Sequence, residues 1–279
     1  MASRPPGVRR IEPSRWLVPV DFHELWQYRG LVRFFVVRDI KSRYRQTLVG
    51  PFWAILRPLG SIFVFTLIFG HVANIKTNTG IPYALWLTPG VLAFGYISTA
   101  LNGTSTSLIS NSHLITKTYF PRLYVPISTT LTPLFDLALS LVVLLALFAY
   151  FGRTPSWQIV FLPAFIALGV LVSLGVGLWL CAGTARYRDW MIGVPFVVTL
   201  LMYITPVLYP EVGFIPARFQ WLLEVNPFTA VVVGFRWSMV GTPFGSLTAL
   251  AFSIGIGIAS TVSGLYVFRR AERHMVDLL

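Results

Sequence analysis

The side chains best suited to chemistry in this chain are cations that gather around the start of its first long apolar run. They are Arg38, Lys41, Arg43, Arg45 and Arg57. Guanidinium and ammonium groups bind phosphate oxygens strongly where water is partly excluded. The spacing therefore indicates a surface for the phosphates of anionic lipids beside a membrane. The alternative is that each cation only helps to orient the chain in that membrane.

The motifs of common enzyme sites do not occur in the sequence. It contains no Gly-Lys dipeptide, and hence no phosphate-cradling nucleotide loop of the form G-x-x-x-x-G-K-[ST]. The histidines never form a metal-binding pair such as H-E-x-x-H, and neither a G-x-S-x-G turn nor a suitable carboxylate pair is present. We therefore predict no catalytic residue, no metal site and no cofactor bound by this chain.

The composition is that of a membrane protein with several spans. Of the 279 residues, 55% are hydrophobic and 11% are charged, and the mean hydropathy is +0.70. These values exclude an ordinary soluble domain. The excess of 22 basic over 10 acidic residues fits the basic bias of cytoplasmic loops, so nucleic-acid binding is not predicted. The single cysteine, Cys181, lies in an apolar run and is expected to pack there.

Two segments precede the first apolar run. Residues 1–20 are basic and proline-rich, and they lack the apolar core of a cleavable signal peptide. Residues 21–49 predict an amphipathic helix at the membrane interface, because Asp21 and Glu24 suit its first turn and its surface combines cations with aromatic residues. Residues 50–279 are expected to form the transmembrane domain.

Six apolar segments are long enough to cross a bilayer, which takes about 20 residues of helix. They are residues 51–73, 83–109, 125–151, 159–182, 190–209 and 247–268. Six spans place both termini on one side of the membrane. If that side is cytoplasmic, only four of the 22 basic residues fall outside, namely Lys76, Arg153, Arg218 and Arg236. The charge bias therefore predicts a multi-pass membrane protein with both termini on the cytoplasmic side.

The segment 210–243, between the fifth and sixth spans, contains two short helical candidates. They cover residues 216–225 and 228–240 and are separated by Asn226-Pro227, which disfavours a continuous helix. Each is too short to span, and a single crossing here would move the basic residues after residue 268 outside. The sequence thus predicts a re-entrant helical hairpin on the external side. The alternative is a surface loop packed against the bundle.

Polar residues mark two of the spans. The second span holds Ser98, Thr99, Asn102, Thr104, Ser105, Thr106 and Ser107. Such residues either allow close helix packing or line a polar passage, and their density favours the passage. The third span holds Asp136, whose burial in a membrane is costly enough to indicate a function. We expect no Lys or Arg partner for it at that depth; the alternative is a carboxyl group bonded to Thr, Ser or Tyr.

Small residues recur at four-residue spacing in the fourth and sixth spans. The pairs are Ser173 with Gly177, Ser253 with Gly257, and Ser260 with Gly264. Because small side chains let helix backbones approach closely, these pairs predict tight helix contacts within the chain or between two copies of it.

Several ordered motifs resemble those of the permease subunits of ABC-2 type polysaccharide exporters, and most closely those of the O-antigen exporters. The motifs are RDIKSRYRQTLVGPFWAILRPL (38–59), ITKTYFPRLYVPI (115–127), ARYRD (185–189), TPVLYP (205–210) and NPFTAVVVGFRW (226–237). The likeness covers the chain from about residue 22 onward. The leader 1–20 and the pair Gly183-Thr184 depart from it.

The resemblance implies a homodimer of six-span permeases joined to two copies of a separately encoded ATPase, which would bind the ATP and Mg²⁺. It also implies export of a glycan linked to undecaprenyl diphosphate, by a protein of the cytoplasmic (inner) membrane. One rival interpretation is an ABC-2 permease for teichoic acid, capsule or a small hydrophobic compound. Another is an ion-coupled secondary transporter centred on Asp136. The missing carboxylate pair and metal site disfavour a membrane-embedded glycosyltransferase.

The resemblance further implies roles for four groups of residues. The lipid diphosphate is expected to contact Arg38, Lys41, Arg43, Arg45 and Arg57. The ATPase is expected to contact Lys117, Thr118, Tyr119, Pro121 and Arg122. The sugar passage is expected to be lined by Trp53, Tyr83, Trp86, Tyr96, Ser98, Asn102, Asp136 and Tyr203. An external gate is expected to contain Tyr209, Phe214, Trp221, Asn226, Pro227 and Arg236.

Overall fold

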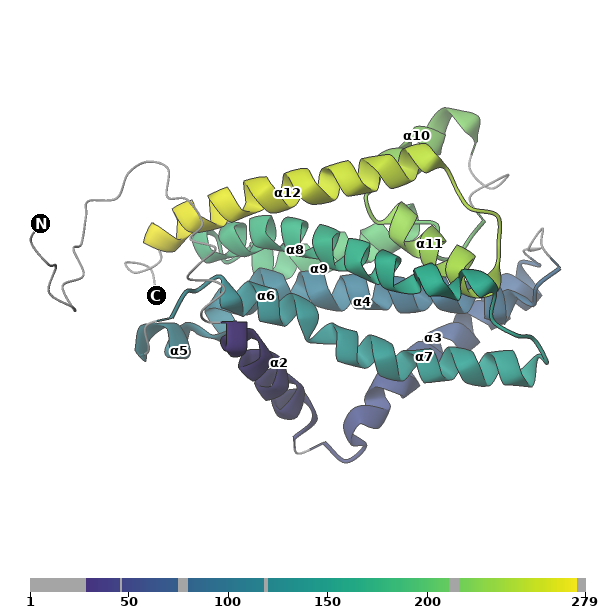
Figure 1. Cartoon of the computed structure of the whole chain (residues 1–279), viewed down its shortest axis with the longest axis horizontal. Helices are drawn as coiled ribbons and strands as arrows, with labels where there is room; N and C mark the ends of the chain where they lie inside the picture. Colours follow the sequence, from purple (N-terminus) through teal and green to yellow (C-terminus); the bar gives the residue numbers. More distant parts are fainter. Residues whose placement is uncertain (1–28, 46, 75–79, 118–119, 211–215, 275–279) are drawn as a thin grey trace, which may run out of the picture.

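The computed structural model describes residues 29–45, 47–74, 80–117, 120–210 and 216–274 (Figure 1). All regular elements in these ranges are helical, as predicted. The leader 1–20 and the predicted helix start at Asp21 lie outside the described residues. The part of the interfacial segment that is described contains one helix, α2 (Arg29–Tyr44).

The remaining helices follow in chain order and carry the labels of Figure 1. They are α3 (Trp53–Phe65), α4 (Tyr83–Ser110), α5 (Ser112–Lys117), α6 (Tyr124–Leu131), α7 (Pro133–Tyr150), α8 (Leu162–Arg186), α9 (Trp190–Ile204), α10 (Gln220–Val225), α11 (Thr229–Val240) and α12 (Leu247–His274). A 3₁₀ turn (Gly50–Phe52) precedes α3 and a π-helical stretch (Thr66–Val72) extends it. Short 3₁₀ turns also precede α8 (Trp157–Phe161) and α10 (Ala217–Phe219).

Five helical segments among the described residues are long and apolar enough to cross a membrane. They are Gly50–Val72, Tyr83–Ser110, Tyr124–Tyr150, Trp157–Arg186 and Leu247–Glu272. These segments coincide with five of the predicted spans to within a few residues. The predicted span 190–209 contains α9, which has 15 residues and is followed by the irregular segment 205–210. The count of six spans therefore stays a prediction.

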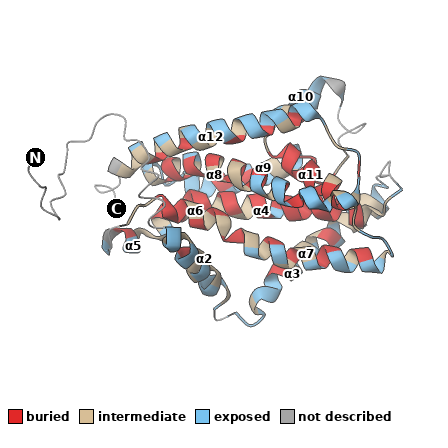
Figure 2. Ribbon diagram, viewed as in Figure 1, coloured by how far each residue is buried: buried red, intermediate tan, exposed pale blue. Residues whose placement is uncertain are grey.

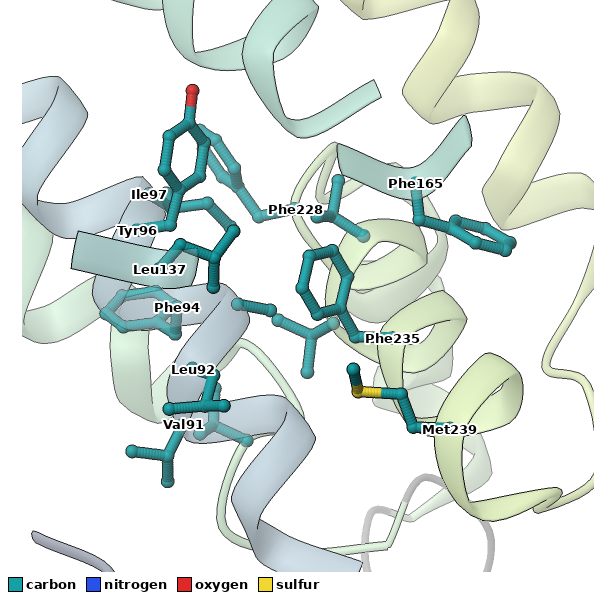
Figure 3. Packing of buried hydrophobic residues seen from close by; sticks show 14 of the residues in the cluster. Val91, Leu92, Phe94, Tyr96, Ile97, Leu137, Phe165, Phe228, Phe235 and Met239 are labelled. Carbon is teal, nitrogen blue, oxygen red and sulfur yellow. The ribbon is translucent and has the colours of Figure 1, made fainter. Parts of the chain in front are cut away.

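Helix α4 forms the centre of the bundle. In the most apolar 18-residue stretch of α4, 78% of the residues are buried, whereas the corresponding shares in Gly50–Val72 and Leu247–Glu272 are 11% and 17%. Figure 2 shows this contrast as a red band along α4 and pale blue along much of α3 and α12. Figure 3 shows α4 side chains in one hydrophobic cluster with Leu137 of α7, Phe165 of α8 and Phe235 of α11. The other helices are thus arranged around α4.

Three of the seven polar residues singled out on the second span are buried among the helices around α4. Thr104 is fully buried and its hydroxyl lies 2.8 Å from that of Thr130 on α6. Ser107 is also buried, with its Oγ 3.4 Å from the Sγ of Cys181 on α8. Ser105 is buried and donates to the backbone carbonyl of its own helix at Asn102. For these three residues the prediction of a wet surface is wrong, because neighbouring helices cover them.

The contact between α8 and α12 is close because glycines lie at it. Gly264 of α12 faces the Gly175 carbonyl of α8, and Gly257 packs against Leu171 and Val172. The hydroxyl of Thr261 donates to the Leu171 carbonyl across the same contact at 3.1 Å. The prediction of close packing is therefore confirmed for Gly257 and Gly264. On α8 the prediction is also confirmed for Gly177, which packs closely against Thr104 of α4.

We predict that Gly175→Ala weakens the α8–α12 contact. A β-carbon at Gly175 would collide with the side chain of Ser260 and the backbone nitrogen of Thr261. Overpacking of this kind costs about 1–3 kcal/mol. The matched control is Gly255→Ala on α12, where a β-carbon meets nothing within 4 Å. Thermal loss of the monodisperse peak in detergent should shift to a lower temperature for Gly175→Ala alone; equal behaviour of the two variants would contradict the prediction.

Candidate functional site

A cavity of about 350 Å³ lies where α2, α3, α4 and α7 meet. Figure 1 shows α2 and α3 as two arms that meet at the loop between them, below α6 and α7. The polar and aromatic lining of the cavity consists of Arg43, Tyr44, Thr47, Trp53, Arg57, Ser61, Tyr96, Thr99, Asp136 and Ser140. Four helices and one loop thus supply a site that mixes cations, a carboxylate and aromatic rings.

The reversal of the chain between α2 and α3 positions the cations. Gly50 has φ +56°, a left-handed conformation that glycine adopts without steric cost. Pro51 follows at the first turn, where its missing N–H is not needed. The end of α2 therefore faces the first turns of α3. Because Trp53 and Arg57 are four residues apart on a helix, they share one face, and both line the cavity.

Asp136 is bound by two residues at the end of α2. Arg43 forms an ion pair with one carboxylate oxygen, and the hydroxyl of Tyr44 donates to the other. The prediction that Asp136 has no Lys or Arg partner concerns only the spans; the partner Arg43 comes from outside them, on the interfacial helix. The alternative of a bond from Tyr is confirmed by Tyr44. The side chains of Arg43 and Asp136 are 36% and 25% exposed, so water still reaches this pair.

The protonation of Tyr44 is fixed at neutral pH. Burial, and next the hydrogen bond to Asp136, raise the pKa of the Tyr44 phenol to about 12, while the charges of Arg43 and Arg57 act in the opposite direction. Tyr44 therefore stays a hydrogen-bond donor. Within the described part of the chain no carboxylate pairs with Arg57, so the cavity holds two guanidinium groups against one carboxylate. This arrangement has a net positive charge and can bind an anion.

On the side of the cavity opposite the end of α2, a serine joins α7 to α3. Ser140 of α7 lies between the Ala54 carbonyl of α3, at 2.8 Å, and the Asp136 carbonyl of its own helix, at 2.7 Å. Tyr96 of α4 is buried, and its hydroxyl donates to the Thr130 carbonyl at 3.2 Å. These bonds fix α3, α4, α6 and α7 around the cavity independently of α2.

Only two of the five predicted phosphate-contacting cations, Arg43 and Arg57, line the cavity. Arg38 pairs instead with Asp39 at 2.6 Å and donates to Asn111, just after α4, at 2.7 Å. Lys41 and Arg45 are exposed at the surface of the chain. Arg38 thus fastens α2 to the end of α4, whereas Lys41 and Arg45 remain available to headgroups or a partner.

The loop predicted to contact an ATPase rests on α2 and α12. The ring of Phe120 packs against that of Phe35 on α2, with centroids 5.3 Å apart. Arg122 donates to the Glu272 carbonyl of α12 at 3.0 Å. Among the predicted residues, Lys117 is exposed at the end of α5 and Pro121 is half-buried. Thr118 and Tyr119 lie outside the described residues.

A second cluster fastens the opposite end of the bundle, where α4 and α8 begin. Arg236 of α11 is 2% exposed and lies with its guanidinium 3.7 Å from the ring centroid of Trp86. It donates to the carbonyls of Trp86, Pro206 and Val207 at 3.3, 2.9 and 3.1 Å. Tyr83 donates to the Leu208 carbonyl at 2.6 Å. Arg236, which was predicted for the gate, therefore joins α4, α11 and segment 205–208 together with Tyr83 and Trp86, which were predicted for the passage.

The other residues predicted for the gate and the passage lie on α4 and between residues 203 and 227. Asn226 is buried and donates to the Thr205 hydroxyl at 2.9 Å, and Tyr209 donates to the Ile204 carbonyl at 2.9 Å. Trp221 and Tyr203 are exposed. Ser98, Asn102 and Pro227 are half-buried, with Ser98 and Asn102 bonded at 3.4 Å. Phe214 lies outside the described residues.

Sequence reasoning missed Tyr44, Thr47, Ser61 and Ser140 as members of the cavity, whereas Thr99 is among the polar residues named for the second span. Tyr44 is adjacent to Arg43, but nothing in the local pattern connects either residue to Asp136, which lies 93 positions after Arg43. The bonds of Ser140 to α3 depend on how α3 and α7 pack. No periodicity or motif carries that information.

Comparisons with known proteins match most of the chain. A family model described as ABC-2 type transporter matches residues 31–240. The O-antigen export system permease protein RfbA of Myxococcus xanthus is 30% identical over 215 residues, covering 76% of this chain and 81% of the relative. A protein of that name from Klebsiella pneumoniae is 27% identical over 246 residues, 87% and 92% of the two chains. The polysialic acid transport protein KpsM of Escherichia coli is 23% identical over 253 residues, 88% and 95%.

We predict that Arg236→Met destabilises the fold by loosening the attachment of α11 to α4 and to segment 205–208. The change keeps the length of the side chain but leaves carbonyl groups of three residues without their donor, and each buried polar group so orphaned costs about 1–3 kcal/mol. The control is Arg218→Met, which removes the same charge from an exposed position. Thermal stability in detergent should fall for Arg236→Met only. An unchanged midpoint would show that the cluster does not fasten α11.

Proposed function

The chain belongs to the ABC-2 type transporter family, and on that premise we propose that it is the permease subunit of an ATP-driven exporter of lipid-linked polysaccharide. The cargo is a glycan of the O-antigen type carried on undecaprenyl diphosphate. The names of the relatives from Myxococcus xanthus and Klebsiella pneumoniae support this choice of cargo. Capsular polysaccharide is the second candidate, because the less similar KpsM relatives carry polysialic acid in their name.

The observation that carries the proposal is the cavity between α2, α3, α4 and α7. It combines Arg43 and Arg57 with the aromatic rings of Trp53 and Tyr96. Guanidinium groups bind phosphate through paired, charge-assisted hydrogen bonds. Aromatic rings beside them offer apolar surface to a lipid or to the C–H face of a sugar. The cavity thus has the chemistry that a lipid diphosphate with its first sugar requires.

In our proposal the chain crosses the cytoplasmic membrane six times, with both termini inside. Helix α9 together with segment 205–210 makes the fifth crossing, and α10 with α11 forms the external re-entrant hairpin. The positions of α11 residues support the hairpin. Val231, near the start of α11, packs against Gly169 well inside α8, whereas Met239 near its end accepts a bond from Ser156, before α8 begins. The chain thus returns outward along α11.

The working assembly in this proposal is a homodimer with two copies of a separate ATPase, which binds the ATP and Mg²⁺. The loop 113–122 contacts the ATPase, and its bonds to α2 and α12 would pass a movement to both helices. Trp53 and Tyr203 are exposed on α3 and α9, so they are available to a passage between the two copies. Trp86 and Tyr96 are buried within one chain.

We predict that Arg57→Gln weakens the response of the complex to its cargo. The chain is co-purified with the ATPase encoded beside it, and ATP hydrolysis is measured with and without undecaprenyl-diphosphate-linked glycan. Loss of one charge-assisted phosphate contact should raise the concentration of glycan that gives half-maximal stimulation about tenfold or more, since such bonds contribute roughly 1.5–3 kcal/mol. Arg33→Gln removes the same charge from an exposed position on α2 and is the control.

Two outcomes would contradict the proposed function. If the chain purifies without an ATPase and proton-dependent flux is lost in Asp136→Asn, the protein is an ion-coupled transporter. If a complex forms but its ATP hydrolysis ignores lipid-linked glycan and responds to a small hydrophobic compound, the cargo assignment is wrong.

A further inference from the structure

We propose that Asp136 is an internal substitute for the anionic ligand, which a lipid diphosphate displaces from Arg43 and Tyr44 when it enters the cavity. The identity of the ligand rests on the proposed function. The displacement itself rests on the geometry of the cavity. When no ligand is bound, Asp136 neutralises Arg43 at one end of the cavity, and Arg57 at the other end is open to an anion.

The bonding of Asp136 imitates the bonding of a phosphate. Two oxygens of one anionic group accept from two different donors, the Arg43 guanidinium and the Tyr44 hydroxyl. Both donors lie at the end of α2, and both line the cavity. A phosphate group also offers several oxygens to such donors, and with more charge. The carboxylate and a phosphate therefore compete for one pair of donors.

The competition favours an anion because the Asp136 pair is weak. Both partners are partly exposed, and ion pairs that water reaches contribute little to stability. Arg57, at the cavity and without a carboxylate partner among the described residues, attracts the incoming anion. A released Asp136 carboxylate remains accessible to water in the cavity. Exchange of one anion for the other thus leaves no charge buried alone.

The arrangement of donors selects two phosphates over one. A single phosphate can bind Arg57 and leave Asp136 in place. A second phosphate, joined to the first, is held near Arg43 and Tyr44 and competes with the carboxylate there. A cavity of about 350 Å³ is at the small end of ligand pockets, which span about 300–1,000 Å³. It suits a diphosphate and its neighbouring groups, and a polysaccharide chain must lie outside it.

Displacement of Asp136 changes how helix α2 is attached to the bundle. With Asp136 released, the end of α2 is bonded to the ligand and no longer to α7. The middle of α2 remains fastened through Phe35 to Phe120 and through Arg38 to Asn111. The contact at Phe120 lies in the loop that meets the ATPase in our proposal, and the contact at Asn111 lies just before that loop. Helix α2 therefore has two arrangements, one for the empty and one for the occupied cavity.

The test measures lipid binding to the complex of this chain and its ATPase in phosphatidylcholine nanodiscs. The probes are undecaprenyl diphosphate, undecaprenyl monophosphate and phosphatidylglycerol. Asp136→Asn removes the competing charge, so we expect the Kd for the diphosphate to fall about threefold to fivefold, because an ion pair that water reaches contributes up to about 1 kcal/mol. The Kd for the monophosphate should not change. Asp39→Asn is the matched control, since Asp39 pairs with Arg38 away from the cavity.

The outcomes separate this inference from the proposed function. If no form of the complex binds the diphosphate probe, the proposed function fails. If wild type binds it but Asp136→Asn binds no more tightly, or Asp39→Asn gains equally, only the displacement fails. Equal binding of phosphatidylglycerol and the diphosphate would show a general site for lipid phosphates and overturn the selection of two phosphates.

A second measurement keeps the inference testable if Asp136→Asn does not fold. Spin labels are placed on cysteines at the exposed positions Ser42 of α2 and Ala138 of α7, in a chain that keeps Asp136. The native Cys181 is buried and does not react. Undecaprenyl diphosphate should lengthen the distance between the labels, and the monophosphate should not. An unchanged distance with saturating diphosphate would overturn the proposal.

Discussion

Hydrocarbon offers no hydrogen bonds, so each polar group that this chain carries into a bundle needs a partner from the chain itself. Helix α4 meets this requirement at both ends. Thr104 is bonded to Thr130 near one end, and the Trp86 carbonyl accepts from Arg236 near the other. These bonds join α4 to α6 and α11, and the apolar side chains between them complete the packing.

The two charged clusters satisfy the same requirement in different ways. Arg236 is almost fully buried and is held by carbonyl groups and an aromatic face. Carbonyls of the backbone cannot leave without unfolding the segment that carries them, so this cluster is permanent. Asp136 is held by two side chains at the end of a helix, and water reaches the pair. Side chains exchange partners by rotation, so this cluster can change its state while the fold persists.

The sequence predicted the parts of the fold that depend on local pattern. The second span begins at Tyr83 as expected, because a long apolar run identifies a helix without knowledge of its neighbours. The break at Asn226-Pro227 does separate α10 from α11, since proline restricts the residue before it. The cations before the first span were recognised as a group, but only packing decides that Arg43 and Arg57 enter the cavity while Lys41 does not. The partner of Asp136 and the burial of Arg236 depend on segments far apart in the chain, and no local pattern encodes them.

The short length of α9 has a consequence for the membrane itself. Its 15 residues extend about 22 Å at 1.5 Å per residue, whereas a bilayer core is about 30 Å thick. Its outer face carries exposed apolar side chains, among them Ile192, Phe196 and Leu200. In the six-span arrangement the irregular segment 205–210 has to complete this crossing. Thinning of the bilayer is one way to accommodate a short helix, and a thinner bilayer beside α9 would shorten the path of a polyprenyl chain that changes leaflets there.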